Sequence, residues 1–161
     1  MAFLPEHVRA IVDTREQTPF DLSPLMCKSS GLATGDYSVD GMEDQVCLER
    51  KELGDLIACC GPERERFIRE LQRMKAYQHR MVIVEAAWAQ IVTGSYRSQL
   101  DPKAAVHSII SFQAHYAVPF LFAGTRDMAQ EAAKYFLYTC AKHQWIRSEP
   151  FRKVIDATRS K

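Results

Sequence analysis

The stretch that most constrains the fold is Glu49-Arg50-Lys51, which lies between an apolar run and a helical pattern. Residues 45–48 are mostly apolar and favour a strand, whereas residues 55–57 begin a helical pattern. Three charged side chains at the end of a core strand lower stability unless they are paired or used. In a strand, Glu49 and Lys51 point to one face and Arg50 points to the other. The stretch therefore predicts a strand end at which a carboxylate and an ammonium share one cavity.

The apolar and turn patterns predict an α/β layer fold with a mixed sheet flanked by helices. An Asp40-Gly41 turn predicts a hairpin, and proline, serine and glycine in residues 17–31 predict a loop. Asp101 and Thr125 are expected to cap helices. Val106, Ile109 and Ile110 are expected to face inward from the first of these helices. On the helix expected at 63–77, one apolar stripe is formed by Phe67, Ile68, Leu71 and Met74. The expected strands cover 9–12, 32–39, 45–50, 80–85 and 117–122, and the expected helices cover 52–60, 63–77, 101–116 and 125–145.

The size and composition of the chain favour one domain over residues 1–161, with a core at about 9–145 and a loosely held, charged tail at 147–161. The net charge of +1 neither requires nor excludes a nucleic-acid partner. Five cysteines without a CxxC spacing predict reduced thiols that mostly pack in the core. No apolar run is long enough to span a membrane, and the first residues do not resemble a signal peptide.

Acidic residues gather at or near the ends of several expected strands. They are Asp13 with Glu16, then Asp36, then Glu49. Carboxylates are hard oxygen ligands, so together with Lys51 they favour magnesium or manganese over zinc. The five histidines are scattered and are expected to be structural or at the surface. Such metal ions activate water and stabilise the oxygens of a phosphodiester, while a lysine stabilises developing charge.

Two simpler interpretations stay open from the residues alone. The acidic and basic groups could form a surface cluster of ion pairs, because a lone E-x-K pattern is common. Arg66, Arg69 and Arg73 fall on one side of the helix expected at 63–77. That stripe is either a solvated face or a contact to DNA phosphates.

The sequence resembles the nuclease domain of the XPF-type structure-selective endonucleases, a branch of the restriction-endonuclease-like PD-(D/E)xK fold. The motifs that carry the resemblance are Val12-Asp13-Thr14-Arg15-Glu16, Gly35-Asp36-Tyr37, and Glu49-Arg50-Lys51 followed by Asp55. The similarity extends over about residues 9–143 through the later helices and strands. The E-R-K-x-x-x-D pattern is its most specific part.

The resemblance implies a role for each matching residue. Asp13, Glu16, Asp36 and Glu49 would bind Mg²⁺ or Mn²⁺, and Lys51 would be the catalytic lysine. Arg15 and Arg50 would face the phosphate or support the acids. Asp55 would support the site, and Arg66 would line the site or the DNA path.

The resemblance also implies an intracellular endonuclease of DNA repair or recombination that cuts branched DNA as a homodimer. The location would be cytoplasmic, nucleoid-associated or nuclear, and a helicase could be a partner. The dimer would use helices at roughly 104–116 and 126–143. These helices carry more apolar residues than one buried face needs, namely Ile109, Ile110, Phe112, Tyr116, Tyr135, Phe136, Leu137 and Tyr138. The same residues could instead fill a thick monomer core. Two other functions stay open: a nicking or non-specific nuclease of a virus or mobile element, and a non-catalytic subunit that binds branched DNA.

Overall fold

Six strands form one mixed sheet in the computed structural model, which describes residues 2–159. The strand order is β2-β1-β3-β4-β5-β6. The middle pairings, β1 with β3 and β3 with β4, are antiparallel, and the outer pairings are parallel. The strands are β1 (Arg9–Asp13), β2 (Met26–Ser30), β3 (Tyr37–Val39), β4 (Val46–Lys51), β5 (His79–Val84) and β6 (Phe120–Phe122).

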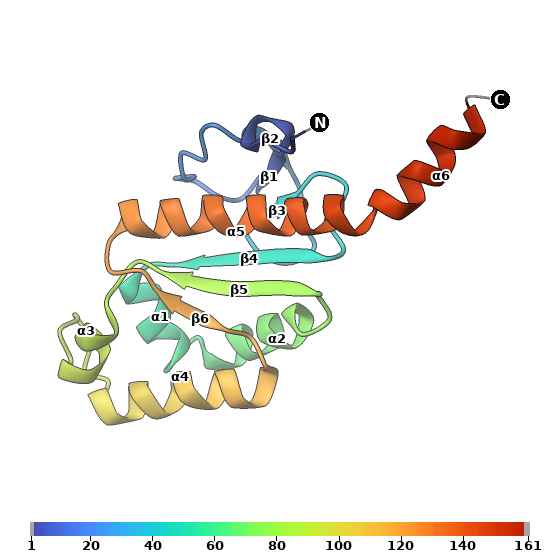
Figure 1. The fold of residues 1–161 in the computed structure, drawn as a ribbon. Helices are drawn as coiled ribbons and strands as arrows, with labels where there is room; N and C mark the ends of the chain where they lie inside the picture. The colour runs from blue at the N-terminus through green and yellow to red at the C-terminus, as the bar shows by residue number, and fades with distance from the viewer. Residues whose placement is uncertain (1, 160–161) are drawn as a thin grey trace.

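Helices cover both faces of this sheet (Figure 1). The long helix α5 crosses one face, and α1, α2 and α4 lie against the other. The helical elements are η1 (Pro5–His7), α1 (Leu53–Cys59), α2 (Arg64–Met74), α3 (Trp88–Thr93), α4 (Pro102–Tyr116), α5 (Arg126–Arg147) and α6 (Glu149–Arg159). The expected α/β layer fold with a central mixed sheet is therefore confirmed.

The side-chain alternation of β5 explains why the sheet has two cores. Ile83 joins the apolar cluster that includes Leu137 of α5. Val82 and Val84 point the opposite way and join the cluster that includes Leu71 of α2. Because consecutive strand residues face opposite sides, a short run of uninterrupted apolar residues marks a strand that is covered on both faces.

Local signals placed several element boundaries correctly. Asp101 accepts a hydrogen bond from the amide of Ala104 and caps α4, and Thr125 accepts one from Met128 and caps α5. β3 and β4 form the hairpin expected around Asp40-Gly41. The strand that follows Pro119, β6, lies at an edge of the sheet, as proline favours.

The expected loop over residues 17–31 is wrong in part, because Met26–Ser30 forms β2. This strand pairs in parallel with β1 at the edge of the sheet, and most of its side chains are exposed. No alternation of buried and exposed positions marks it, so pairing with β1 creates the strand. The expected strand over residues 32–39 shrinks to β3, because Gly35 takes a left-handed conformation.

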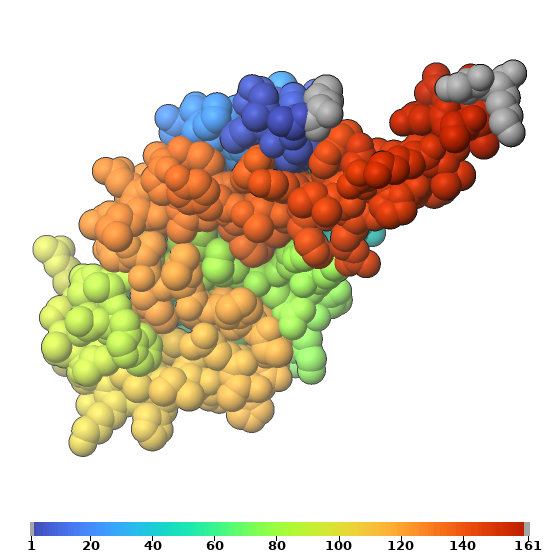
Figure 2. Space-filling model, in the orientation of Figure 1, coloured from blue at the N-terminus to red at the C-terminus, as the bar shows by residue number. Residues whose placement is uncertain are grey.

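The helical regions contain two further differences. The short helix α3 was not expected. Ile110, expected to face inward on α4, is 53% exposed, and Phe112 packs in the core instead. Within the charged tail expected at 147–161, Glu149–Arg159 forms α6, which buries no side chain and projects from the body of the molecule (Figure 2), and residues 160–161 lie outside the described part of the chain.

Four of the five cysteines are buried and all are free thiols, in agreement with the expected core packing, whereas Cys27 is exposed. Among the described helices, none is long and apolar enough to cross a membrane.

Candidate active site

Backbone hydrogen bonds bring the three acidic clusters to one end of the sheet. The amide of Asp13 donates to the carbonyl of Asp36 at 2.8 Å, and the amide of Asp36 donates to the carbonyl of Leu48 at 2.9 Å. The amide of Arg50 donates to the Asp36 carboxylate at 2.8 Å. Asp36 therefore connects the end of β1 to the end of β4 and is held in place by both strands.

Gly35 allows this close approach to β4. Its φ is +82°, and a Cβ at this position would lie 2.7 Å from Cys47 Sγ and 3.1 Å from the carbonyl oxygen of Leu48. Side chains other than glycine rarely take this conformation, and the contact with the backbone of Leu48 leaves little room to adjust. The glycine before Asp36 is therefore a packing requirement of the site.

Glu49 and Lys51 share one face of β4, as the strand alternation predicts. The Lys51 ammonium forms a very short contact with the Glu49 carboxylate, and Glu49 is only 4% exposed. Burial would lower the pKa of Lys51, but Glu49 and Glu70 outweigh it and raise that pKa above its ordinary value. Lys51 therefore remains a cation at neutral pH and can stabilise negative charge.

Glu70 of α2 is an acid of this face that the sequence interpretation missed. Its carboxylate lies 3.8 Å from Lys51 Nζ. Burial raises the pKa of Glu49 well above its ordinary value, and Asp36 and Glu70 add to the increase. Burial also raises the pKa of Asp36, to which Glu16 and Glu70 contribute. These carboxylates thus lie near one another, and each disfavours ionisation of the others. In the sequence, only its position one residue before the buried Leu71 of the same helix could have indicated that Glu70 lies near the site.

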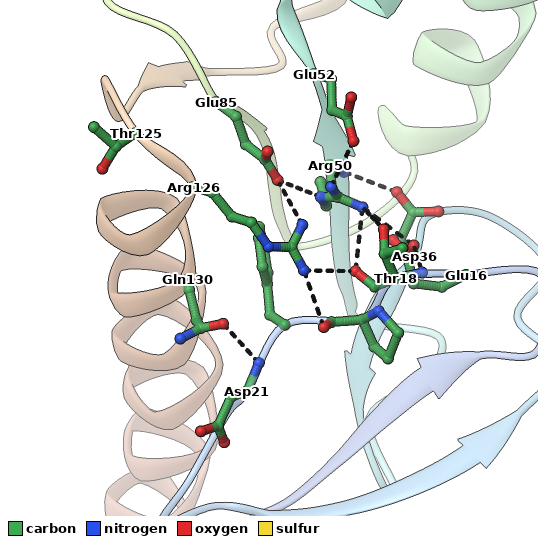
Figure 3. A network of polar contacts seen from close by, with 12 residues as sticks. Glu16, Thr18, Asp21, Asp36, Arg50, Glu52, Glu85, Thr125, Arg126 and Gln130 are labelled. Carbon is green, nitrogen blue, oxygen red and sulfur yellow. Dashed lines mark hydrogen bonds and ion pairs between the residues drawn. The ribbon is translucent and has the colours of Figure 1, made fainter.

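Arg50 occupies the opposite face of β4 and organises a second ionic network (Figure 3). Its side chain is 7% exposed and pairs with Glu85, with Glu16 at 3.2 Å and with Glu52 at 2.9 Å. The Arg50 guanidinium also lies over the ring of Phe20, 5.2 Å from its centroid. In this arrangement Arg50 supports acidic residues, which is one of the two roles expected for it.

Glu85 and Arg126 complete that network and were not among the expected site residues. Arg126 donates to Glu85 at 3.3 Å and to the carbonyls of Thr18 and Pro19 at 2.7 and 3.1 Å. The network thereby ties the start of α5 to the segment after Glu16 and to β5 (Figure 3). Glu85 directly follows an apolar strand and Arg126 opens a capped helix, but neither position signals a partner more than 40 residues away in sequence.

The Asp13 carboxylate bonds to residues close to the end of β1 rather than to the other acidic clusters. It is 2% exposed, and its carboxylate accepts hydrogen bonds from the amide of Leu32 at 2.7 Å and from the amide and guanidinium of Arg15. Burial alone would raise the pKa of Asp13, but the hydrogen bonds from Arg15 and Leu32 outweigh it and hold that pKa below its ordinary value. Asp13 and Arg15 therefore join the end of β1 to the segment that follows β2.

The arginine stripe on α2 is exposed. Arg66 pairs with Glu63 at 2.8 Å, and Arg73 donates to the Thr34 hydroxyl at 3.2 Å. Arg69 is also exposed, and Asp55 is exposed in the first turn of α1. Phe67, Leu71 and Met74 form the buried face of α2, as predicted. Arg73 thus contacts Thr34, which precedes Asp36 by two residues in the sequence, whereas Arg66 pairs with Glu63 at the start of α2.

The donor set suits a hard divalent cation. Within residues 2–159, no three acidic, histidine or cysteine side chains converge to form a ready metal cage. Mg²⁺ does not need one, because it keeps several waters and commonly uses only one or two protein carboxylates. Asp36 and Glu49 can supply these: burial, with a smaller contribution from neighbouring carboxylates, raises the pKa of both, and a cation would favour their ionised forms.

A mixed sheet with helices on both faces, and with acids and a lysine at its strand ends, defines the restriction-endonuclease-like class of nuclease fold. Residues 12–136 match the ERCC4 domain. The chain belongs to the ERCC4 domain family. The expected membership in the XPF-type group and the expected fold are thus both confirmed.

Solved structures share this fold. XPF from Aeropyrum pernix is 20% identical, with a TM-score of 0.67 over 82% of this chain. XPF from Aeropyrum pernix in complex with DNA is 22% identical, with a TM-score of 0.64 over 85% of this chain. The match spans 61% and 66% of those two longer chains. No match was found among curated proteins.

Proposed function

We propose that this chain is a divalent-cation-dependent DNA endonuclease that hydrolyses phosphodiesters at or near branched structures such as flaps, forks and junctions. The observation that carries the proposal is the joint placement of Asp36, Glu49 and Lys51 at one strand end of an ERCC4 domain. The solved relative in complex with DNA supports DNA as the substrate. Mg²⁺ or Mn²⁺ is the proposed cofactor.

Each side chain has a distinct proposed task. Asp36 and Glu49 hold the cation, which supplies an activated water and stabilises the oxygens of the phosphate. Lys51 remains protonated and stabilises charge that develops on the phosphate. Glu16 and Arg50 fix the opposite side of β4, and Asp13 joins the cation site only by giving up hydrogen bonds to Arg15 and Leu32.

The arginines of α2 are the proposed contacts to the DNA backbone. Arg73 contacts Thr34, two residues before Asp36, and Arg66 and Arg69 extend the positive charge along the helix. Each phosphate contact that is lost should weaken binding on all sequences alike and reduce the dependence of affinity on salt. Asp55, exposed at the start of α1, is proposed to support this side of the site.

A homodimer is the proposed assembly. Of the apolar residues expected at the interface, Ile109, Phe112 and Leu137 fill the core of the monomer. Ile110 and Tyr135 remain exposed, and Leu121 and Met128 add to the apolar surface of β6 and α5. Sedimentation analysis at micromolar concentration tests the proposal, and a single species of one chain mass, 18.4 kDa, would contradict it.

Cleavage of labelled DNA tests the activity. Flap, fork, nicked-junction and linear duplex substrates are incubated with Mg²⁺ or Mn²⁺ and with EDTA as the metal-free control. Asp36→Asn should abolish cleavage, whereas Glu43→Gln, an exposed acid in the β3–β4 turn, should cut like the wild type. Equal rates on linear and branched DNA would instead indicate a non-specific or nicking nuclease. Binding of branched DNA without cleavage under either metal would indicate a non-catalytic subunit.

A further inference from the structure

The proposed cation site contains a conflict over Glu49. The carboxylate that would hold the cation is already paired with the Lys51 ammonium and is almost fully buried. Two cations competing for one buried carboxylate repel each other strongly, because the surroundings screen charge poorly. For Glu49 to serve a divalent ion, Lys51 therefore needs another partner.

Glu70 is placed to be that partner. Among residues 2–159, Glu49 and Glu70 are the carboxylates within 4.0 Å of Lys51 Nζ. The Glu70 carboxylate is already 3.8 Å away, so a small movement of a flexible lysine side chain would complete the pair. No described side chain donates a hydrogen bond to Glu70, so its oxygens can accept one.

The position of Glu70 is fixed by its helix. Phe67, Leu71 and Met74 anchor α2 in the core, and the ring of Phe67 lies 5.2 Å from Lys51 Nζ. The Glu70 side chain is 21% exposed, whereas that of Glu49 is 5% exposed. Glu70 is thus more exposed than Glu49 and stands on a helix anchored in the core, and an ammonium paired with Glu70 remains close to Glu49.

We propose that Glu70 is a positioning residue that takes the Lys51 ammonium from Glu49 when a divalent cation binds to Asp36 and Glu49. This inference rests on the proposed nuclease function and adds a regulatory step to the same site. Lys51 serves as an internal counter-ion of Glu49 when no divalent cation is bound, and it moves aside when the cation replaces it. Glu70 holds the Lys51 ammonium in position for the phosphate after the exchange.

The exchange predicts opposite effects of two substitutions on metal affinity. Lys51→Met removes the competing ammonium and should tighten Mn²⁺ binding. Glu70→Gln removes the second partner, so Lys51 stays on Glu49 and Mn²⁺ binding should weaken by about 10-fold to 100-fold, the usual effect of losing a residue that supports a metal ligand. When Glu70→Gln is added to Lys51→Met, the Mn²⁺ affinity should differ from that of Lys51→Met alone by less than about twofold, because both substitutions act through the same exchange.

Titration calorimetry with Mn²⁺ on the full chain without DNA measures these affinities. Glu65→Gln, an exposed acid on the same helix, removes the same charge and should leave the affinity near that of the wild type. Equal weakening by Glu70→Gln with and without Lys51 would overturn the proposal, because Glu70 would then act only through its charge. No weakening, or no Mn²⁺ binding by the wild type, would overturn it as well.

Two further measurements keep the test decisive. If Lys51→Met fails to fold by circular dichroism, Glu70→Asp retains the charge but withdraws the carboxylate by one methylene. The proposal then predicts weaker Mn²⁺ binding, and unchanged binding would refute it. DNA cleavage is assayed separately, because a wild type that binds Mn²⁺ with this pattern but cuts no DNA would refute the proposed function alone.

Discussion

Asp13→Asn is the substitution for which the structure gives the clearest expected effect on stability. Both carboxylate oxygens accept hydrogen bonds from groups that can only donate: Oδ1 from the amide and Nε of Arg15, and Oδ2 from the amide of Leu32 and from Arg15 Nη2. An asparagine offers one acceptor oxygen, so its NH₂ group must face a donor in either orientation. The variant therefore cannot satisfy all of these groups at once.

The expected loss can be estimated from burial. An unsatisfied buried donor such as the Leu32 amide costs about 1–3 kcal/mol. The Arg15 side chain is 72% exposed, so loss of its ion pair adds only about 0–1 kcal/mol after solvent screening. We expect the free energy of unfolding at pH 7 to fall by about 2–3 kcal/mol and the Tm to fall by about 5–10 °C.

The effect should depend on pH in a defined direction. The pKa of Asp13 in the folded state lies below its ordinary value of 3.8, because the hydrogen bonds to the ionised form outweigh the burial that would raise it. A lowered carboxyl pKa stabilises the fold above the unfolded-state pKa, and this contribution is lost as the pH falls through the folded-state value. The difference between wild type and variant should therefore shrink below about pH 4.

Urea unfolding followed by circular dichroism at pH 7 and at pH 3 measures both expectations. Asp44→Asn, at an exposed position in the β3–β4 turn, is the matched control and should change stability by less than about 0.5 kcal/mol. If Asp13→Asn unfolds at the wild-type urea concentration at pH 7, the structural role of the Asp13 carboxylate is refuted. A variant of normal stability that no longer cuts DNA would place Asp13 in the chemistry instead.

Three further predictions concern the supports of the site. Gly35→Ala should lower stability by about 1–3 kcal/mol in thermal melts, because Gly35 has a positive φ and contacts β4 closely. Gly54→Ala in α1, where the space around the residue is open, should raise stability by about 0.5–1 kcal/mol. Equal effects of the two substitutions would contradict the packing argument. Arg126→Met should speed hydrogen exchange at residues 16–21 and cost about 1–2 kcal/mol, and unchanged exchange there would show that Arg126 does not hold this segment. Ending the chain after Ser148 should leave the urea midpoint within error of the wild type, because α6 buries no side chain.

The elements that could be predicted from the sequence are those that carry their own local signal. β5 was marked by consecutive apolar residues, and α4 and α5 were marked by Asp101 and Thr125 at their caps. β2 has no such mark, because an exposed edge strand gains its structure from the hydrogen bonds of its neighbour. The misassigned Ile110 shows a related limit: α4 is apolar on several sides, so periodicity alone could not choose its buried face.

The site divides in the same way. Strand alternation, which is a local property of the backbone, predicted the side of β4 to which each side chain of Glu49, Arg50 and Lys51 points. Glu70 and Arg126 come from helices that reach the site only through the packing of the whole domain. Their partners are distant in sequence, and an acid or arginine on a helix surface is usually solvated. Only the assembled fold reveals what these residues contact.

The alternation along β4 has a consequence for how this chain can change. Substitutions at Glu49, Arg50 or Lys51 each affect one face of the strand, but inserting or deleting a single residue before them would exchange the two faces together. The Lys51–Glu49 pair would then move to the face of β4 on which Arg50 pairs with Glu16 and Glu85. The β3–β4 turn, where Glu43 and Asp44 are exposed, can absorb changes of length that leave the strand register intact. In a deletion scan, tolerance should therefore be high in that turn and should end abruptly where β4 begins.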